Sequence, residues 1–483
     1  MRLKPILTVL GFLVFAVGLA MLTAYPVSLY YEGTDASPIL LASVCTIVSG
    51  LLLWFLFRNP EADELRVREG FAIVTFGWMI VPLFGSLPYL FSGAIPSFTD
   101  AYYETVSGFT TTGASILTDV EALPNGLHYW RMLTHWLGGM GIIVLSLAIL
   151  PLLGIGGMQL YKAEVAGPMK DKLTPRVAET ARLLWGLYVL LTVSQVVLLV
   201  VGDMPLFDAV CHAFATISTG GFSTKNASIA HYNSVYIDCV VMFFMFVGGT
   251  NFALHFGALK GRFADYFRDT EFKFFLGTLG VAVLVVTAVI GESSFGGDYL
   301  KSLRYVAFNI ISVMTCTGFA TADFAIWAPL AQVVLLFLMF PGACGGSTGG
   351  GMKTIRVLIL LKTAASELKK IAHPKVVANV RLGGKTVDQE ILFTVAGFII
   401  LYLVTFATST ILLTATGLDI VTSMSAIASA MANVGPGLGT VGPMANFAHL
   451  SDLAKWVLSS CMLLGRLEIY TVFVLFSAAF WKR

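Results

Sequence analysis

Apolar stretches long enough to cross a bilayer recur along the chain and dominate its pattern. A spanning helix needs about 20 mostly apolar residues, because the hydrocarbon core offers the backbone no other hydrogen-bond partners. Ten nearly charge-free stretches meet this need: 5–30, 38–57, 70–94, 136–158, 183–202, 239–259, 274–291, 325–341, 391–416 and 456–481. The pattern predicts an all-α polytopic membrane protein. The first stretch is too long for a signal-peptide core, so we expect a retained helix.

Basic residues mark alternate connections between these stretches. Of the 30 Lys and Arg residues, 24 lie on one set of connections, which includes both ends of the chain. The positive-inside rule places that set, and both termini, in the cytoplasm. The opposite connections are acidic. They either concentrate cations near the outer face or only lack the basic residues of the inner face.

Composition narrows the class of protein further. Hydrophobic residues make up 57% of the chain and charged residues 12%, too few to cover a soluble protein of 483 residues. The six cysteines are far apart, without the spacing of a disulfide framework or a metal site. No nucleophile–base, zinc-protease, phosphate-loop or dinucleotide motif occurs, so we expect no enzyme and no covalent cofactor.

Four outward connections share an internal repeat. Each is 30–40 residues long and carries a Thr/Gly cluster: TTTGAS at 110–115, STGGFS at 218–223, TCTGFAT at 315–321 and NVGPGLG at 433–439. Their aligned glycines are Gly113, Gly221, Gly318 and Gly435. Asp100 and Asp208 each precede their glycine by 13 residues and could cap a helix of about three turns. Such a helix is too short to cross a bilayer, so it should dip in and return.

The helices that follow each dip also resemble one another. Their matching segments are LGGMG at 137–141, VGGTN at 247–251, PGACG at 341–345 and LGRLE at 464–468. Two features in the same order, at a period near 100 residues, predict repeats of helix, re-entrant half-helix and helix. For these segments within helices, tight packing is the simpler explanation. His135 and His212 are expected to be interfacial or packing residues.

The repeats predict how the chain is divided. We expect a leading transmembrane pair at 1–65, followed by four pore repeats. The repeats occupy 66–158, 159–259 with a preceding cytoplasmic segment, 260–388 with a broken second helix and a basic cytoplasmic segment, and 389–483.

Non-helical backbone at membrane depth must be buried in protein or face water. Four such loops around one axis would place a ring of main-chain carbonyls there, and carbonyls can replace the hydration shell of an alkali ion. Glycine permits the positive φ that this arrangement needs, and half-helix C-termini aimed at the ring favour a cation. The repeats therefore predict a cation pore with pseudo-fourfold symmetry.

Two features predict a gate. Residues 342–352 (GACGGSTGGGM) are too rich in glycine to hold a helix, so they form either an intramembrane loop or a passive kink. Arg466 lies within an apolar span, where a guanidinium normally faces the protein interior or water. It either projects into the pore and bonds loop carbonyls, or pairs with an acid from another helix. Glu468, two residues on, lies on a different side of the helix and is not its partner.

These motifs, with HWLGGMGI at 135–142, GGSTGGGMKTIRVL at 345–358 and GRLEIY at 465–470, resemble the TrkH/KtrB superfamily of potassium-translocating membrane subunits. The resemblance covers essentially the whole chain and is greatest to bacterial TrkH proteins. It implies one potassium-selective pore per subunit, with glycine rather than serine at the first filter position favouring potassium. The filter residues that it implies are Thr111, Thr112, Gly113, Thr219, Gly220, Gly221, Thr317, Gly318, Phe319, Val434, Gly435 and Pro436. The fourth cluster departs from Thr-x-Gly, since Asn433 and Val434 precede its glycine.

The resemblance also implies a gate, partners and a location. The gate would comprise Gly345, Gly346, Ser347, Thr348, Gly349, Gly350, Gly351 and Arg466. We expect a homodimer in the bacterial inner membrane, with a cytosolic ring of TrkA-type regulatory subunits that bind ATP or ADP. K⁺ is the permeant ion and the only metal. The alternative is a K⁺ symporter driven by H⁺ or Na⁺. The expectation that no Asp or Glu except Glu468 lies deep in a span favours the channel.

Overall fold

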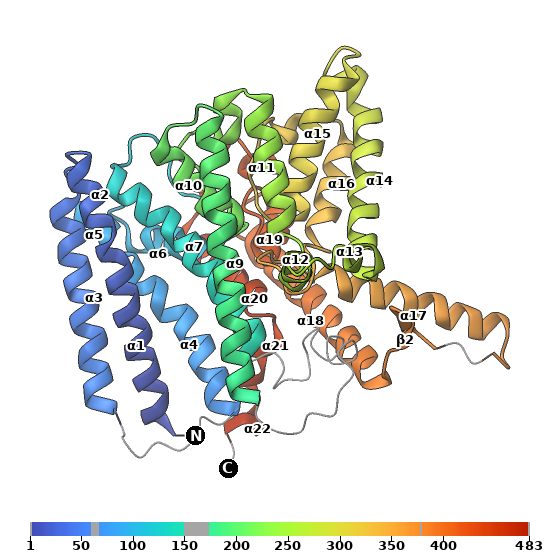
Figure 1. Ribbon diagram of the computed structural model, residues 1–483, viewed down its shortest axis with the longest axis horizontal. Coiled ribbons are helices and arrows are strands. Elements are labelled where there is room, and N and C mark those ends of the chain that lie inside the picture. The colour runs from blue at the N-terminus through green and yellow to red at the C-terminus, as the bar shows by residue number, and fades with distance from the viewer. Residues whose placement is uncertain (1, 59–66, 149–172, 377–378, 482–483) are drawn as a thin grey trace.

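The computed structural model describes residues 2–58, 67–148, 173–376 and 379–481, and helices form nearly all of it (Figure 1). The chain starts with an antiparallel pair made of α1 (Leu3–Leu22), its short continuation α2 (Ala24–Tyr30) and α3 (Ala36–Phe57). Gly50 brings the two backbones together, because a methyl group there would lie 2.3 Å from the backbone nitrogen of Phe15. Such close approach through small residues is how helices associate in lipid.

Each of the four repeats begins with a long apolar helix. These helices are α4 (Val67–Gly85) with α5 (Leu87–Ser92), α9 (Leu173–Val201), α14 (Thr270–Ser293) and α18 (Gln389–Thr414). All four contain a window apolar enough to cross a membrane. A short helix follows each one, as predicted: α6 (Phe98–Phe109), α10 (Leu206–Ile217), α15 (Tyr299–Met314) and α19 (Ile420–Ala432). At 12 to 16 residues these helices are too short to span a bilayer.

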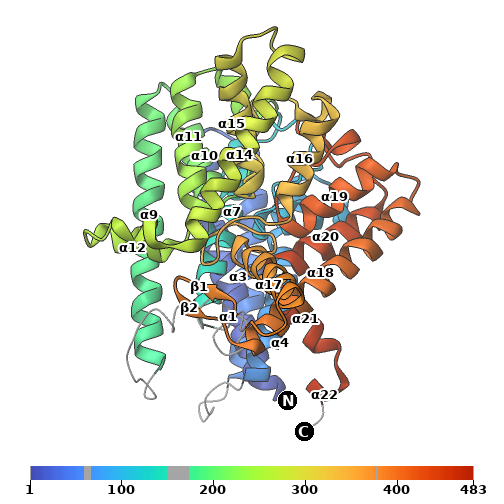
Figure 2. The same cartoon turned by 90° about the vertical axis from the view of Figure 1, so that its right-hand side faces the viewer.

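The third element of each repeat departs most from the predicted straight spans. Only α7 (Asn125–Ala148) is a single helix. In the second repeat α11 (Val235–Gly248) and α12 (Phe252–Leu259) meet at 103° across Gly249–Asn251, and α12 projects from the body (Figure 2). In the third, the glycine-rich loop separates α16 (Pro329–Met339) from α17 (Thr354–Ala372). In the fourth, α20 (Asp452–Arg466) and α21 (Tyr470–Phe473) form part of a pair bent by 104°.

These breaks explain why ten predicted spans become fewer continuous ones. Within the described residues, six helices are long and apolar enough to cross a membrane, or up to eight if each bent pair counts as one span. The predicted 239–259 and 456–481 spans are therefore bent, and 325–341 contains a helix of only 11 residues. The end of the 136–158 span and most of the expected cytoplasmic segment 159–182 lie outside the described residues.

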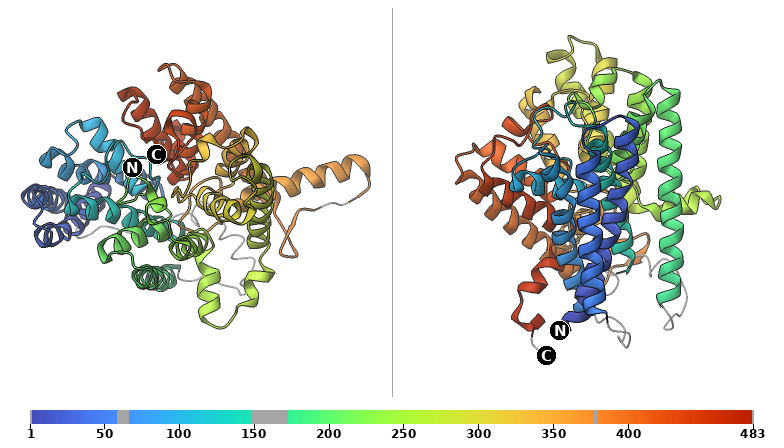
Figure 3. Two further views of the ribbon diagram at one scale, coloured as in Figure 1. Left: turned by 90° about the horizontal axis from the view of Figure 1, so that it is seen from above. Right: turned by 90° about the vertical axis from the view of Figure 1, so that its left-hand side faces the viewer.

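Seen from above, the repeats follow one another around the middle of the molecule (Figure 3). The start of α1 lies at the same end of the molecule as α22 (Ala478–Trp481) (Figure 1). The connections contain η2 (Ser228–Tyr232), α13 (Ala264–Arg268), η3 (Phe324–Ile326), η4 (Gly439–Val441) and η5 (Val474–Phe476). One small antiparallel hairpin, β1 (Arg381–Leu382) and β2 (Lys385–Thr386), is the exception to the helical fold among the described residues.

Candidate ion pathway

The four Thr/Gly loops share one backbone conformation. Each aligned glycine has a positive φ: 82° at Gly113, 81° at Gly221, 82° at Gly318 and 104° at Gly435. The residue two positions earlier also has a positive φ, although it is not glycine: Thr111, Thr219, Cys316 and Asn433, at 53° to 61°. A non-glycine residue rarely adopts this conformation, so its recurrence at one register position identifies the loops as true repeats.

The loops close into a ring. A methyl group on Gly113 would lie 2.1 Å from the carbonyl oxygen of Gly220, and one on Gly221 would lie 2.0 Å from that of Thr317. A methyl group on Gly318 would lie 1.9 Å from the carbonyl oxygen of Val434, and one on Gly435 would lie 2.7 Å from that of Thr112. Each glycine therefore abuts the residue that precedes the next loop's glycine, and the fourth loop returns to the first. The structure brings the four glycines together, with the widest contact between the fourth and first loops.

The shared backbone conformation begins two residues before each glycine, whereas the predicted set of filter residues begins one residue later in the third and fourth loops. In the first two loops the set covers the residues at positions −2, −1 and 0 relative to the glycine. In the third and fourth loops it covers positions −1, 0 and +1, so it includes Phe319 and Pro436 and omits Cys316 and Asn433. The omitted Asn433 binds two neighbours, because its Nδ2 donates to Thr112 Oγ1 at 2.9 Å and to the carbonyl of Met462 at 3.0 Å.

The short helices direct their C-terminal ends at this ring. Helices α6, α10, α15 and α19 each end within three residues of the position −2 residue. Their unsatisfied carbonyl ends carry partial negative charge, which favours a cation. The predicted caps are wrong in detail. Ser97 caps α6 and Pro205 precedes α10, while Asp100 and Asp208 lie in the first turns and pair with Lys455 and Lys225, respectively.

Glycine pairs in the following elements pack beneath the ring. Gly138 abuts the end of its own short helix at Phe109, and Gly139 abuts the next repeat at Ser218. The pair Gly248 and Gly249 does the same with Ile217 and Thr315, and the pair Gly349 and Gly350 with Thr315 and Ala432. The third matching pair is therefore 349–350, and the alignment through PGACG at 341–345 is wrong. In the fourth repeat Gly465 abuts Met431, and Arg466 takes the place of the second glycine.

Arg466 joins several repeats at this level. Its side chain is buried, and its guanidinium donates to the carbonyl of Thr348 at 2.7 Å and to that of Gly138 at 3.2 Å. The single hydroxyl proton of Thr348 is shared between the carbonyl oxygens of Ile217 and Gly248, each 3.0 Å from Oγ1. Among the described residues no carboxylate forms an ion pair with Arg466, so the alternative of an acid from another helix finds no support there. Glu468 pairs with Arg356 instead.

The glycine-rich loop, residues 340–353, connects α16 to α17 and is held by several hydrogen bonds from polar groups. Glu271 Oε1 accepts from the backbone N–H groups of Gly345 at 2.6 Å and Ile355 at 3.1 Å, so one carboxylate binds both the loop and the first turn of α17. The loop also bonds the second repeat, through Cys344 N–H to Gly249 O and Phe252 N–H to Gly346 O. Lys353, with a φ of 69°, donates from its buried ammonium to the carbonyl of Gly349. A passive kink would not need these contacts.

Two of the buried carboxylates, Glu104 and Glu271, bind the loops but have no role in the sequence-based predictions. Glu104 lies in α6 and pairs with Arg131 at 2.7 Å, and both side chains are at most 2% exposed. Glu271 is 8% exposed. Neither residue lies deep in a predicted span, because Glu104 belongs to the short helix α6 and Glu271 is the second residue of α14. Both residues lie in or beside predicted connections, where an acid usually faces solvent, so their position could not predict their burial. Only the charges at 104 and 131 within otherwise apolar segments could have indicated the first pair.

Both histidines contribute to packing and hydrogen bonding inside the protein. His135 and His212 have no exposed surface. His135 Nδ1 donates to the carbonyl of Gly108 at 2.8 Å, and its Nε2 accepts from the N–H of Phe222 at 3.3 Å. The ring also packs on Phe222, with centroids 4.1 Å apart. His135 therefore links α6 to the second loop and is a packing residue rather than an interfacial one.

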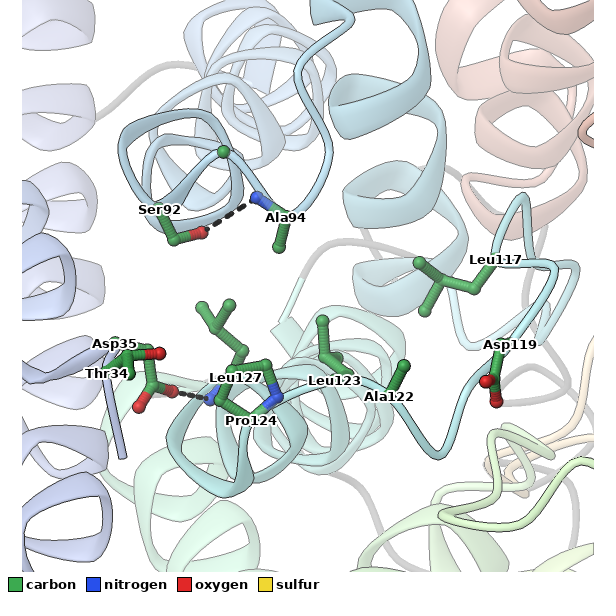
Figure 4. Close-up of a pocket in the computed structure, with 11 residues that line it drawn as sticks. Thr34, Asp35, Ser92, Ala94, Leu117, Asp119, Ala122, Leu123, Pro124 and Leu127 are labelled. Carbon is green, nitrogen blue, oxygen red and sulfur yellow. Dashed lines mark hydrogen bonds between the residues drawn. The ribbon is translucent and has the colours of Figure 1, made fainter. Parts of the chain in front are cut away.

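A separate cavity of about 260 Å³ lies between the leading pair and the first repeat (Figure 4). Its two carboxylates already accept hydrogen bonds: Asp35 from Ser28 and from the N–H of Leu127, and Asp119 from Asn226 Nδ2 at 2.8 Å. The bond from Asn226 lowers the pKa of Asp119 below its usual value. The cavity is not lined by any of the loop glycines, so it is distinct from the ring.

A multi-pass membrane protein with four re-entrant loops closed around a carbonyl-lined centre has the architecture of a cation-transport protein. A family model described as "TrkH: Cation transport protein" matches residues 36–483, and the chain belongs to the TrkH family. It is 41% identical to the Trk system potassium uptake protein TrkH of Salmonella typhimurium over the full length of both chains. It is 37% identical to the TrkG protein of Escherichia coli, over 98% of this chain and 97% of that protein.

The fold also matches a solved structure over its full length. The crystal structure of the potassium transporter TrkH from Vibrio parahaemolyticus superposes with a TM-score of 0.92, at 37% identity, and each chain is fully covered. The pore-repeat fold is therefore that of the family, and the relatives are named as uptake proteins and transporters rather than enzymes.

Proposed function

We propose that this chain mediates potassium uptake through a gated, K⁺-selective pore across the bacterial inner membrane. The choice of potassium is supported by the relatives, which are named potassium uptake proteins and match this chain over nearly its whole length. The filter is the ring at Thr111–Gly113, Thr219–Gly221, Cys316–Gly318 and Asn433–Gly435, where K⁺ exchanges its hydration shell for main-chain carbonyls. K⁺ is the substrate of the reaction, and the proposal requires no cofactor.

One observation carries the proposal: each loop glycine abuts the carbonyl of the residue that precedes the next loop's glycine, and the fourth loop closes on the first. A packing seam would place glycines against helix backbones within a pair of helices. Here four consecutive contacts form a closed circuit around one centre, which is the arrangement that a carbonyl filter needs.

The gate consists of the loop at Gly345, Gly346, Ser347, Thr348, Gly349, Gly350 and Gly351, together with Arg466. The guanidinium supplies a positive barrier to cations beside the axis and fixes the loop through Thr348. Opening requires that this bond and the bonds from Glu271 be released or shifted together, so the loop has two discrete arrangements for a regulator to select.

The proposal includes the assembly and its orientation. We propose a homodimer with both termini in the cytoplasm, and repeat boundaries near residues 66, 159, 260 and 389. A TrkA-type ring that binds ATP or ADP contacts the basic inner surface. Helix α17 supports an interaction on that side, because it projects from the body and exposes Leu368 and Ile371 at 68% and 77% (Figure 1). Light scattering of the detergent-solubilised protein tests the dimer.

A K⁺ symporter coupled to H⁺ or Na⁺ is the competing function. The buried Glu104 and Glu271 give it a specific basis, since carboxylates inside a membrane often carry the coupling ion. Both already accept fixed hydrogen bonds from backbone or arginine, which argues for a structural role. Symport predicts saturable flux with a fixed stoichiometry to the driving ion, whereas a pore conducts along the K⁺ gradient alone.

Ion flux into liposomes tests the proposal. Purified wild-type protein and Gly113→Ser are compared with K⁺, Rb⁺, Na⁺ and Li⁺ on one side at a time. We expect wild-type flux to favour K⁺ and Rb⁺, and Gly113→Ser to lose that preference. Equal flux of all four ions through folded wild-type protein, or an unaltered preference in the variant, would contradict the assigned filter.

A further inference from the structure

In three repeats the residue nine positions before the loop glycine binds the segment that follows this glycine. These residues are Glu104, His212 and Asn309, and Ala426 has the equivalent position in the fourth repeat. The first three contact a hydroxyl that follows the glycine by two or three residues. In the fourth repeat Ser425, one residue before Ala426, instead accepts from a backbone N–H three residues after the glycine. We call Glu104, His212, Asn309 and Ser425 the supporting residues.

The first supporting residue is part of a buried ion pair. Glu104 accepts from Ser115 Oγ at 3.0 Å and from the N–H of Ile116 at 2.9 Å, so it fixes the segment directly after Gly113. Its partner Arg131 continues to the second loop. The Arg131 guanidinium donates to the carbonyl of Ser223 at 3.1 Å and lies 3.5 Å from the ring centroid of Phe222. One ion pair thus holds the first two loops against each other.

The other three supporting residues, His212, Asn309 and Ser425, form hydrogen bonds without carrying a charge. Ser223 Oγ donates to His212 Nε2 at 3.0 Å, because the Nδ1 proton is given to the carbonyl of Asp208. Asn309 Nδ2 donates to Thr321 Oγ1 at 3.2 Å. In the fourth repeat the N–H of Leu438 donates to Ser425 Oγ at 2.8 Å. All four loops are therefore bonded from the same turn of their own short helix.

We infer that the supporting residues, and the Glu104–Arg131 pair above all, are positioning residues that set the bore of the ring and hence its preference among alkali ions. The inference rests on the proposed function. A ring of carbonyls discriminates ions of different radius only if the oxygens resist moving inward around the smaller ion. Buried, hydrogen-bonded groups behind the loops provide that resistance, because each displacement would stretch hydrogen bonds that water cannot replace.

The decisive readout is the ratio of Rb⁺ to Na⁺ uptake in liposomes, with the amount of folded protein measured separately. The double variant Glu104→Gln/Arg131→Met removes both charges together and leaves no unpaired buried ion. We expect its ratio to fall by roughly fivefold or more, the change that the loss of one ordinary hydrogen bond can produce. A purely structural role would lower the yield of folded protein and leave the ratio unchanged.

The matched control removes an ion pair of the same kind away from the ring. Asp238→Asn/Arg304→Met eliminates the 2.7 Å pair between α11 and α15, and we expect its ratio to equal that of wild type. If the Glu104/Arg131 double variant does not fold, Ser115→Ala and Ser223→Ala decide, because each removes only a hydroxyl. A smaller loss of preference in both supports the inference, and wild-type ratios in both overturn it.

Gly113→Ser separates failure of this inference from failure of the proposed function. If Gly113→Ser alters the ion ratio while the Glu104/Arg131 and hydroxyl variants do not, the ring is the filter and the supporting residues do not set its preference. If none of these variants alters the ratio, the ring itself is not the filter.

Discussion

The guanidinium of Arg466 donates a 2.7 Å hydrogen bond to the carbonyl of Thr348, although 118 residues separate them in the chain. Arg466 occupies the position at which the other three repeats have the second glycine of a pair. The four repeats thus correspond in these glycine contacts, and the fourth differs from the others by the Arg466 side chain. The long, positively charged side chain of Arg466 replaces the hydrogen atom of a glycine, so it can reach the loop of another repeat.

Replacement of Arg466 with alanine should increase flux through the closed protein. The variant loses a charged hydrogen bond to the loop, a contact of about 1.5–3 kcal/mol, so the balance should move toward open by roughly tenfold or more. Stopped-flow or fluorescence uptake of K⁺ into liposomes measures the change. Arg466→Lys keeps the charge and can reach fewer carbonyls, so its flux should lie between the two. Wild-type flux from well-folded Arg466→Ala would rule out the gate assignment.

Glu271 should act as a latch for the same loop. Glu271→Ala leaves the N–H groups of Gly345 and Ile355 without their carboxylate, and each such buried group costs about 1–3 kcal/mol. We expect increased basal flux with the ion preference intact, because the ring is not altered. Glu390 provides the control: it also lies second in the first helix of its repeat, but it is exposed. If Glu271→Ala and Glu390→Ala have the same flux, the latch does not exist.

Alanine substitutions at the ring glycines should reduce stability and ion preference to different degrees. A methyl group would lie 1.9 Å from a carbonyl oxygen at Gly318 and 2.7 Å at Gly435, and both positions have positive φ. Left-handed backbone alone costs alanine about 1–2 kcal/mol. Gly318→Ala should therefore reduce thermal stability and Rb⁺/Na⁺ preference more than Gly435→Ala does. Gly277→Ala, in open space on α14, should leave both unchanged. The reverse order of severity would show that ring contacts do not determine the cost.

The leading pair should be sensitive to bulk at Gly50. A leucine there must force α1 and α3 apart, because even a Cβ atom would lie 2.3 Å from the backbone of Phe15. Overpacking of this kind typically costs about 1–3 kcal/mol. We expect a lower midpoint in a thermal-aggregation assay, with Gly186→Leu on the exposed side of α9 as the control. Equal midpoints for the two variants would mean that the pair does not depend on close packing.

Much of the fold could be read from local pattern. The long apolar runs predicted α3, α9, α14 and α18, because lipid requires about 20 apolar residues in a helix regardless of what lies beside it. The Thr/Gly clusters predicted four short re-entrant helices for the same kind of reason, since 12 to 16 residues cannot span a bilayer. The bends at Gly249–Asn251 and after Arg466 were not predicted, because the apolar composition continues across both breaks.

The sequence by itself determined the membrane class, the fourfold repeat and the glycines at its centre, since these depend on composition and periodicity along one chain. Only the tertiary structure showed that Cys316 and Asn433 share the backbone conformation of Thr111 and Thr219, that Glu271 binds the glycine-rich loop, and that Glu104 pairs with Arg131. Each of these depends on partners from 27 to more than 100 residues away. A buried charge is stable only if its partners arrive from elsewhere in the fold, and no local pattern specifies which residues will meet there.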